Sequence, residues 1–356
     1  MSSPPAKTHV SENRTDPAFL LACNCRKAPY VPVWFMRQAG RSLPEYRELR
    51  SRGTILEAIM DPSVAAEITL QPVRRYGVDA AILFSDIVVP LVAVGLEIEV
   101  SPGTGPVLAK PFRSRSDLSR LRPLVPEEDM AYVIDAVKLL RSELPTSIPL
   151  IGFAGGPFTL ASYLVEGGPS KDFALTKAFM WSEPVLWREF LDLLAEIALS
   201  SLLAQVDAGA RAVQVFDSWV GGLSPDAYAR FVLPSARRIF DGLRALSVPS
   251  IHFGVGTGEL LSLMGLAGAN VVGVDWRVPL DIARQRVGQG RAVQGNLDPA
   301  VCLAAWPVVA REVRSVLKSA GSAPGHIFNL GHGVLPSTDP GILKAVVDLV
   351  HGESTK

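Results

Sequence analysis

The sequence is poor in cysteine, has no excess of charge of either sign and contains no long apolar run. Three cysteines among 356 residues are too few, and odd in number, for a disulfide framework, which favours a reducing compartment such as the cytoplasm. The 35 basic residues balance the 35 acidic residues, so no overall field would attract nucleic acid or an acidic membrane surface. No apolar run approaches the length of a membrane span. We therefore expect a cytoplasmic protein without nucleic-acid or membrane partners, which holds any anionic ligand with local arginines.

Signals for a metal or a nucleotide are weak. Cys23 and Cys25 are separated by one residue, but Cys302 lies far away and no second pair follows, so we do not expect zinc there. Residues 254–258 (GVGTG) follow an apolar run and imitate a nucleotide-binding turn. Glu259 occupies the position where that motif needs its third glycine, so we do not expect a bound nucleotide.

The N-terminal segment differs in composition from the rest of the chain. Residues 1–16 are polar, contain proline and lack the apolar stretch of a signal peptide, so we expect a flexible N-terminal tail. No linker-like segment interrupts the remainder. We therefore expect one domain over residues 17–356.

Eight short apolar runs recur along this domain and are nearly continuous in apolar character, without polar alternation. This pattern is typical of strands buried on both faces of a parallel sheet. The predicted strands span residues 31–36, 80–84, 150–153, 212–216, 250–253, 271–274, 292–294 and 326–329.

Helical patterns lie between these runs. Four acidic or hydroxyl residues directly precede a proline, a combination typical of a helix N-cap followed by the first helical residue. These pairs are Asp61-Pro62, Ser224-Pro225, Asp298-Pro299 and Asp339-Pro340. The first predicts a helix to about Tyr76, residues 172–207 predict one long helix or two, and residues 96–111 predict a small hairpin.

Eightfold alternation of strand and helix predicts an α/β fold of the TIM-barrel type, a (β/α)8 barrel in a single domain. A doubly wound open sheet is the alternative. In a barrel the active site lies at the C-terminal ends of the strands, so the polar residues that follow each run are the candidate site residues.

The most informative such segment follows the first run, where Arg37 and Arg41 end an apolar stretch. Each guanidinium is a permanently charged planar fork that suits a carboxylate or a phosphate. Gly40 is expected to allow a tight or positive-φ turn between them. The alternative is a surface loop in which the arginines pair with Glu45 and Glu48, which contributes little to stability.

Polar residues follow the other strands as well, and we expect nearly all of them to converge on one mouth. They are Ser85-Asp86, residues 155–157 (GGP), Asp217-Ser218-Trp219, His252 within its strand, Asp275, Asn296, and Asn329 with His332 shortly after. A structural protein would have no reason to place them there.

Two long segments closely resemble the signatures of the uroporphyrinogen decarboxylase family. They are residues 32–41 (PVWFMRQAGR) and residues 152–167 (GFAGGPFTLASYLVEG). Shorter similar pieces are residues 84–87 (FSDI), 216–219 (FDSW) and 329–333 (NLGHG). The resemblance covers residues 17 to 351, and it departs at Ser42, where many relatives carry tyrosine.

The resemblance implies conversion of uroporphyrinogen III to coproporphyrinogen III and carbon dioxide in haem biosynthesis, without a cofactor, in a cytoplasmic homodimer. It implies that Asp86 and Arg37 are catalytic, with Asp86 at the centre of the macrocycle accepting pyrrole N–H bonds. The substrate-binding residues that it implies are Arg37, Gln38, Ala39, Gly40, Arg41, Asp86, Tyr163, Ser218 and His332.

The chemistry agrees with these residues. Loss of carbon dioxide from a pyrrole acetate leaves carbanion character on the methylene, and no sequence pattern points to pyridoxal phosphate, thiamine or a metal as the electron sink. A protonated pyrrole serves as its own sink if an anion such as Asp86 faces it in a dry cavity. The proton donor stays open between Arg37 and a bound water, because a guanidinium is a very weak acid.

Each assigned residue also has a structural interpretation. Asp86 fits a turn or a helix N-cap, and Tyr163 fits a core ring with a satisfied hydroxyl. Ser218 fits the N-cap of the next helix, and His332 fits a structural loop histidine.

Two other functions remain as alternatives. A zinc-dependent thiol or corrinoid methyltransferase shares the barrel architecture, and such enzymes resemble one another in a zinc-binding His-x-Cys near the fifth strand. In this sequence Gly254 stands two residues after His252, where that motif needs its cysteine. A non-catalytic tetrapyrrole carrier would need only arginines and a cavity. Asp86 near so many substrate carboxylates would be a liability in a carrier, which favours catalysis.

Overall fold

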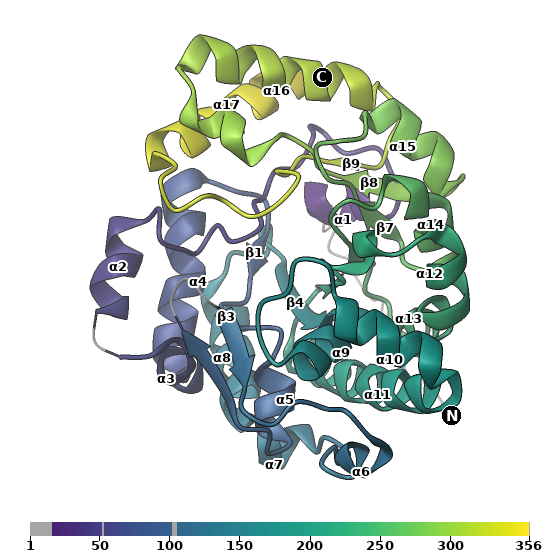
Figure 1. Ribbon diagram of the computed structural model, residues 1–356. Helices are drawn as coiled ribbons and strands as arrows, with labels where there is room; N and C mark the ends of the chain where they lie inside the picture. Colours follow the sequence, from purple (N-terminus) through teal and green to yellow (C-terminus); the bar gives the residue numbers. More distant parts are fainter. Residues whose placement is uncertain (1–15, 52, 102–104, 356) are drawn as a thin grey trace, which may run out of the picture.

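The computed structural model describes residues 16–51, 53–101 and 105–355. Seven parallel strands form one curved sheet in the order β1-β4-β5-β6-β7-β8-β9 (Figure 1). The strands are β1 (Ala81–Ile82), β4 (Leu150–Gly155), β5 (Ala212–Phe216), β6 (Ser250–Phe253), β7 (Val271–Gly273), β8 (Ala292–Gln294) and β9 (His326–Ile327). All seven coincide with predicted strands, although β1 and β9 are only two residues long.

The first predicted strand, residues 31–36, closes the sheet into a barrel through single contacts. Val33 forms an isolated parallel bridge with Phe328, and the Trp34 amide donates to the Phe328 carbonyl at 3.3 Å. On the other side, the Asp79 amide donates to the Val33 carbonyl at 2.8 Å. The segment therefore lies between β9 and β1, as the eighth member of the (β/α)8 barrel.

The prediction of a regular strand over residues 31–36 was wrong because side chains satisfy its backbone donors. Pro32 has no N–H to offer a neighbour. The Phe35 amide donates to the Gln38 side chain at 3.0 Å, and the Met36 amide donates to the Asn329 side chain at 3.1 Å. Buried backbone donors need one partner each, so these side chains replace the ladder of a strand.

Eight helices surround the strands, one after each strand or bridge segment (Figure 1). They are α4 (Pro62–Tyr76), α8 (Ala131–Glu143), α11 (Pro184–Ala208), α13 (Leu233–Leu243), α14 (Leu261–Ala267), α15 (Leu280–Val287), α16 (Trp306–Ala320) and α17 (Pro340–Ser354). A contiguous hydrophobic core reaches from Phe19 to Val350, as expected for sheet and helices packed as one unit.

The predicted N-caps are confirmed. Asp61 accepts from the Ser63 and Val64 amides, Ser224 accepts from Ala227, and Asp339 accepts from Gly341. Asp298 also caps, but it begins a short 3-10 helix, η3 (Pro299–Leu303), and not an α-helix. Residues 172–207 hold two helices, α10 (Ala174–Ser182) and α11.

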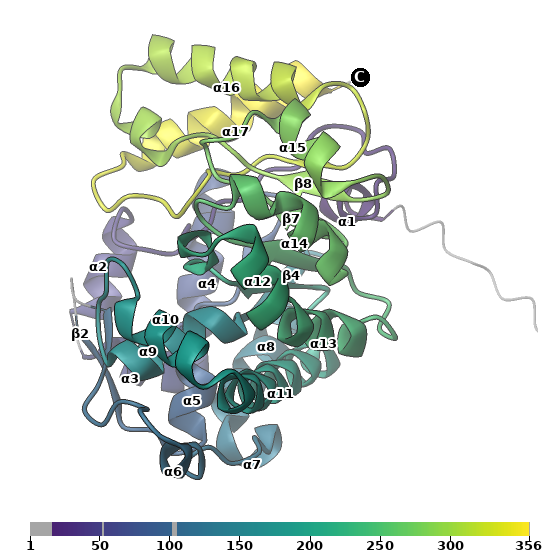
Figure 2. The same cartoon turned by 45° about the vertical axis from the view of Figure 1, so that its right-hand side comes forward.

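The remaining elements decorate the barrel, and Figure 2 shows α10 and α9 alongside the long α11. The predicted hairpin is present as β2 (Ile98–Ser101) antiparallel to β3 (Gly105–Leu108), with its turn outside the described residues. The added helices are α1 (Ala18–Cys23), α2 (Pro44–Arg50), α3 (Ile55–Met60), α5 (Val89–Ala93), α6 (Arg115–Leu118), α7 (Pro126–Asp129), α9 (Pro157–Glu166), α12 (Pro225–Phe231), η1 (Val220–Gly222) and η2 (Gly258–Leu260).

The predicted tail of residues 1–16 lies outside the described residues except for Asp16. The boundary between tail and barrel therefore stays a prediction. Among helices of the described part of the chain, none is both long and apolar enough to cross a membrane.

Candidate active site

Arg37 and Arg41 are both exposed at the carboxyl end of the barrel's first segment. Within residues 16–51, 53–101 and 105–355 neither forms an ion pair, and Glu45 pairs with Arg75 instead, at 3.2 Å. Their guanidinium groups are therefore available to a ligand. The surface-pair alternative is wrong for Glu45.

The turn between the arginines differs from the prediction in detail. The left-handed backbone falls on Arg37, at φ 58°, and not on Gly40. Gly40 is needed for close approach, since a Cβ there would lie 2.9 Å from the Arg37 carbonyl oxygen. Gly333 leaves room for the Arg37 side chain, because a Cβ at that position would collide with its aliphatic part. A non-glycine residue in this conformation carries a local cost, which is typical of functional sites.

Gln38 and Ala39 lie between the arginines in different environments. The Gln38 side chain is fully buried, accepts from the Phe35 amide at 3.0 Å and donates to the Ala80 carbonyl at 3.1 Å. This carboxamide fixes the turn from below, so any contact of Gln38 with a ligand would come from its backbone. Ala39 and Gly40 are half-buried.

Asp86 follows β1 and is half-buried at the same end of the barrel. Its Oδ1 accepts from the Val88 amide at 3.0 Å, as the turn interpretation predicted, but its Oδ2 has no protein donor among the described residues. Burial raises the pKa of Asp86 above its usual range, while the Val88 amide, the Arg37 charge and the Ile87 amide oppose that rise. One oxygen is held in place and the other is left for a ligand.

Tyr163 lies on α9 and presents a half-buried ring to the site. The ring packs on Trp219, with centroids 4.1 Å apart, and lies partly buried against the hydrophobic core. Burial raises the pKa of Tyr163 to about 12, with the Asp86 charge adding to the rise and the Arg37 charge opposing it. The phenol is therefore a neutral hydrogen-bond donor at neutral pH.

His332 lies half-buried after the last strand, with its ring stacked 6.1 Å from that of Phe253. Burial lowers the pKa of His332 to about 4, and the charges of Arg37 and Arg277 lower it further against the opposing charge of Asp275. Its imidazole is neutral at neutral pH. Since Arg37 acts electrostatically on Asp86, Tyr163 and His332 alike, the fold brings these four side chains together.

Ser218 is half-buried in the turn after β5, next to Trp219. The N-cap of the following 3-10 helix, η1, is Trp219, so the N-cap interpretation of Ser218 is wrong. Its hydroxyl has no hydrogen-bond partner in the described structure and lies one residue from the ring that packs on Tyr163.

The prediction that nearly every polar strand end converges on the mouth was too broad. His252 is fully buried and packs against Phe240 of α13, with ring centroids 5.0 Å apart, so it faces the helix layer. Its predicted place in the mouth was wrong because alternate side chains of a strand point to opposite faces, and the neighbouring Phe253 takes the interior face. Burial lowers the pKa of His252 to about 3.

Polar side chains at two other strand ends, Asp275 and Asn296, hold the loops at the rim of the barrel mouth in place. Asp275 accepts from the Gly256 and Arg277 amides and from the Arg277 guanidinium. The Asn296 side chain donates to the carbonyls of Asp275 and Val278 at 2.8 and 2.7 Å. The GVGTG turn is thus tied to Asp275 through the Gly256 amide.

The prediction overlooked an aromatic wall that leads to His332. Phe153 and Phe216 lie 5.4 Å apart between ring centroids, Phe216 and Phe253 lie 6.0 Å apart, and His332 continues the series. Phe153 and Phe216 are half-buried at the carboxyl half of their strands. Their signal in the sequence was a large aromatic on the interior face near a strand end. The wall can pack against a flat, apolar ligand face.

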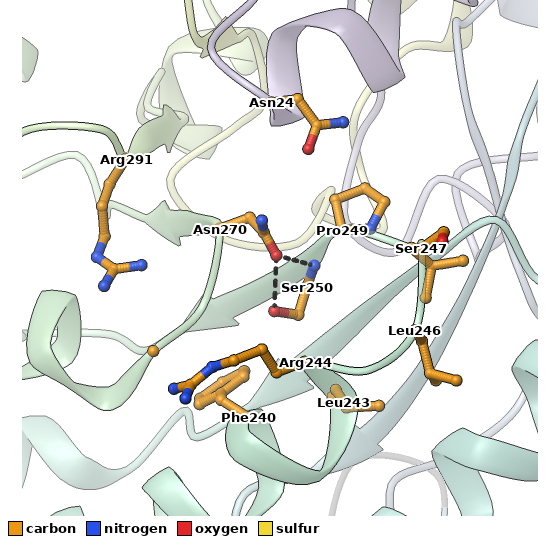
Figure 3. A pocket seen from close by; sticks show the side chains of 12 residues that line it. Asn24, Phe240, Leu243, Arg244, Leu246, Ser247, Pro249, Ser250, Asn270 and Arg291 are labelled. Carbon is orange, nitrogen blue, oxygen red and sulfur yellow. Dashed lines mark hydrogen bonds between the residues drawn. The ribbon is translucent and has the colours of Figure 1, made fainter.

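A separate cavity of about 420 Å³ lies at the opposite end of the barrel. Ser250 begins β6 there, and Figure 3 shows Asn270 bonded to it. Arg244 and Arg291 reach the same cavity, and Arg291 donates to the Ala269 carbonyl. These groups lie at the amino ends of the strands and take no part in the mouth.

The described residues hold no cluster of three or more His, Cys, Asp or Glu side chains that would bind a metal. Cys23 and Cys302 are buried, Cys25 is partly buried, and burial raises the pKa of all three thiols. Raised thiol pKa values disfavour thiolate ligands.

Comparison with known proteins decides the family. The family model described as uroporphyrinogen decarboxylase (URO-D) matches residues 14–353. The chain belongs to the uroporphyrinogen decarboxylase family. The curated uroporphyrinogen decarboxylase of Streptomyces coelicolor is 58% identical over 353 residues, covering 99% of this chain and 97% of that protein. That of Frankia casuarinae is 59% identical over 334 residues, covering 94% and 90%.

Solved structures support the fold of this decarboxylase-family chain. A methyltransferase from Methanosarcina mazei superposes with a TM-score of 0.80 at 21% identity, covering 94% of this chain and 98% of its own. A B12-independent methionine synthase from a Shewanella species reaches 0.55 at 14% identity, covering 82% and 88%. At such identities the likeness shows a shared barrel and no more.

Proposed function

We propose that this chain removes the carboxyl groups of the four acetate side chains of uroporphyrinogen III, giving coproporphyrinogen III and carbon dioxide in haem biosynthesis. The observation that carries the proposal is Asp86, a carboxylate with one unoccupied oxygen beside the unpaired Arg37, at the mouth of a barrel of this family. Such an anion has a use where a cation forms beside it.

Arg37 and Arg41 bind substrate carboxylates. The substrate carries eight carboxylates, and each arginine can hold one with two parallel hydrogen bonds, worth about 1.5–3 kcal/mol for each charged bond. Both guanidinium groups are exposed and lack an acidic partner among the described residues, so no internal ion pair has to break first.

Asp86 faces the centre of the macrocycle and accepts hydrogen bonds from its pyrrole N–H groups. In the free protein, burial raises the pKa of Asp86, so the carboxylate is incompletely solvated before substrate arrives. Pyrrole donors compensate that loss of water. When a pyrrole is protonated at its α-carbon, the carboxylate stabilises the cation that then accepts the electrons released with carbon dioxide.

Tyr163, Ser218 and His332 orient the substrate as neutral hydrogen-bonding groups. The phenol and the hydroxyl donate to carboxylates, and the imidazole is uncharged because its pKa is lowered to about 4. An imidazole that is uncharged at the working pH has no readily released proton, and burial raises the pKa of the Tyr163 phenol to about 12. The donor therefore stays between Arg37 and a bound water, and no external cofactor is required by this scheme.

We further propose that the protein works as a homodimer in the cytoplasm, with uroporphyrinogen as its partner and neither nucleic acid nor membrane. The balanced charge and the sparse cysteines support this, and the homodimer rests on the family alone.

The direct test is incubation of purified protein with uroporphyrinogen prepared under anaerobic conditions, with product and carbon dioxide measured together. We expect coproporphyrinogen and carbon dioxide in stoichiometric amounts. Binding of one substrate per chain without release of carbon dioxide would establish the carrier alternative and overturn the proposal. Inactivation by a chelator, reversed by zinc, would favour the methyltransferase alternative, although His252 faces away from the mouth and Gly254 supplies no ligand.

A further inference from the structure

Asp217 directly follows β5 and is fully buried, so it does not reach the mouth. Its amide donates to the Phe253 carbonyl at 2.8 Å and extends the pairing of β5 with β6. The carboxyl group bonds Thr159 on α9, the helix that carries Tyr163, and Asp217 itself precedes Ser218 in the turn after β5.

The carboxylate caps a helix from a different strand. The helix α9 begins at Pro157 after Gly156, which has no side chain to cap it. Asp217 Oδ1 supplies the missing acceptor, bonding the Thr159 amide at 3.1 Å. A Cβ on residue 156 would collide with this carboxyl group, so glycine there is what admits it. Capping from another strand fixes where the helix begins relative to that strand.

Thr159 also connects Asp217 to the aromatic pair of Trp219 and Tyr163 in the site. The Thr159 hydroxyl donates to Asp217 Oδ1 at 2.8 Å and accepts from the Trp219 amide at 3.2 Å. Trp219 packs on Tyr163, which lies one helical turn after Thr159 on α9. A single hydroxyl therefore joins the carboxylate, the loop after β5 and the helix that carries the phenol.

The second oxygen of Asp217, Oδ2, has no hydrogen-bond donor in the described structure, and the buried Tyr228 hydroxyl on α12 has no partner either. Burial raises the pKa of Tyr228 and the Asp217 charge adds to the rise, so the two groups lie within electrostatic range. An amide at position 217 can keep the Thr159 contacts and donate toward Tyr228.

We propose that Asp217, acting through Thr159, is a positioning residue that holds Tyr163 and Ser218 in register for the substrate. The inference rests on the proposed function, since it assigns these two side chains to substrate binding. It adds a residue that touches no substrate and sets the distance between two that do.

The test compares the steady-state kinetics of Thr159→Val, Asp217→Ala and Asp217→Asn with those of the unchanged protein. Valine keeps the shape of threonine and removes only the hydroxyl. We expect Thr159→Val and Asp217→Ala to raise KM about 10-fold, the effect of one lost oriented hydrogen bond, while kcat changes less than about 3-fold. Asp217→Asn should stay within about 2-fold of the unchanged protein, because its carbonyl oxygen can still cap α9.

Asp79→Ala is the matched control, since it removes another buried, hydrogen-bonded aspartate at the opposite end of the barrel. It should lower stability and leave KM unchanged below its unfolding temperature. If Asp217→Ala does not fold, Thr159→Val decides alone. Unchanged KM in Thr159→Val, or a rise shared by the control, would overturn the inference.

Two further variants separate this inference from the proposed function. Tyr163→Phe and Ser218→Ala test the binding contacts directly. If they raise KM and Thr159→Val does not, positioning is wrong and the proposed function stands. If Thr159→Val raises KM and they do not, the proposed contacts of these side chains are wrong, and with them the positioning role inferred here.

Discussion

Two aspartates flank the short strand β1 and meet opposite environments. Asp79, just before the strand, accepts from the Tyr30 hydroxyl at 2.9 Å, the Val33 amide at 2.7 Å and His351 Nε2 at 2.7 Å. Asp86, just after it, accepts from the Val88 amide of its own turn and from no side chain within the described structure. Both are acidic residues beside the same buried strand, so their chemistry differs only through the partners that the fold supplies.

We infer that Asp79, at the amino end of the barrel, serves stability, whereas Asp86, at the carboxyl end, serves function. The contacts of Asp79 join the first segment to β1 and to the last helix, α17, and so close the structure. Asp86 connects no two elements of the barrel. Burial raises its pKa, so its negative charge is incompletely compensated. An incompletely compensated charge at the mouth of a barrel is typical of a ligand-binding site.

Replacing Asp86 by Asn should have the largest effect on activity. The substitution keeps the size of the side chain and the contact with the Val88 amide, but it removes the negative charge that faces the substrate cation. We expect kcat to fall about 1,000-fold, comparable with loss of a preorganised electrostatic group. Turnover assays on uroporphyrinogen would check this, and near-normal activity would remove Asp86 from the mechanism.

Replacing Asp79 by Ala should have the largest effect on stability. It leaves the buried Val33 amide without its acceptor and frees the end of α17, so we expect a loss of about 3 kcal/mol in the free energy of unfolding. Urea unfolding followed by circular dichroism measures this. A loss of turnover in the folded variant would contradict the division between the two ends.

Replacing Arg37 by Lys should reduce kcat/KM about 30-fold, or about 2 kcal/mol, because an ammonium cannot bind a carboxylate with a bidentate fork. The left-handed backbone at this position stays the same in both proteins. Kinetics at equal ionic strength make the comparison, and an unchanged kcat/KM would show that Arg37 does not contact the substrate.

A smaller effect concerns His252, which belongs to neither end. Its folded-state pKa of about 3 lies below the ordinary value of about 6.5, so the unfolded chain binds the proton more tightly. Its contribution to stability is complete above about pH 6.5 and is lost as the pH falls. At pH 5.5 we expect His252→Leu to reduce this acid loss by about 1.4 kcal/mol, with kcat unchanged. Parallel pH–stability profiles of the two proteins would contradict this.

The sequence predicted the barrel because each apolar run between polar ends is buried on both faces. Seven strands and all four N-caps followed from local rules. The first strand failed, since side chains of Gln38 and Asn329 replace its ladder, and one of these acceptors lies almost 300 residues away. No local pattern announces such a long-range partner.

The candidate site, like the fold, was predicted only in part. Motifs predicted that Arg37, Asp86, Tyr163 and His332 share one mouth, and the Arg37 charge affects the pKa of the other three. His252 was misplaced because a polar residue inside a strand can face either side. The bracing role of Asp275 was not foreseen for a related reason: backbone amides from its own turn and a neighbouring one saturate it, and spacing alone does not reveal that.

We infer that Asp86 serves the reaction and does not stabilise the fold. Urea unfolding at pH 7 tests this inference if the free energy of unfolding of Asp86→Asn is measured beside that of Asp79→Asn. We expect the value for Asp86→Asn to equal or exceed that of the unchanged protein, because a poorly solvated charge is removed. We expect the value for Asp79→Asn to be lower by about 1–3 kcal/mol. A comparable loss in both variants would show that Asp86 stabilises the fold as Asp79 does.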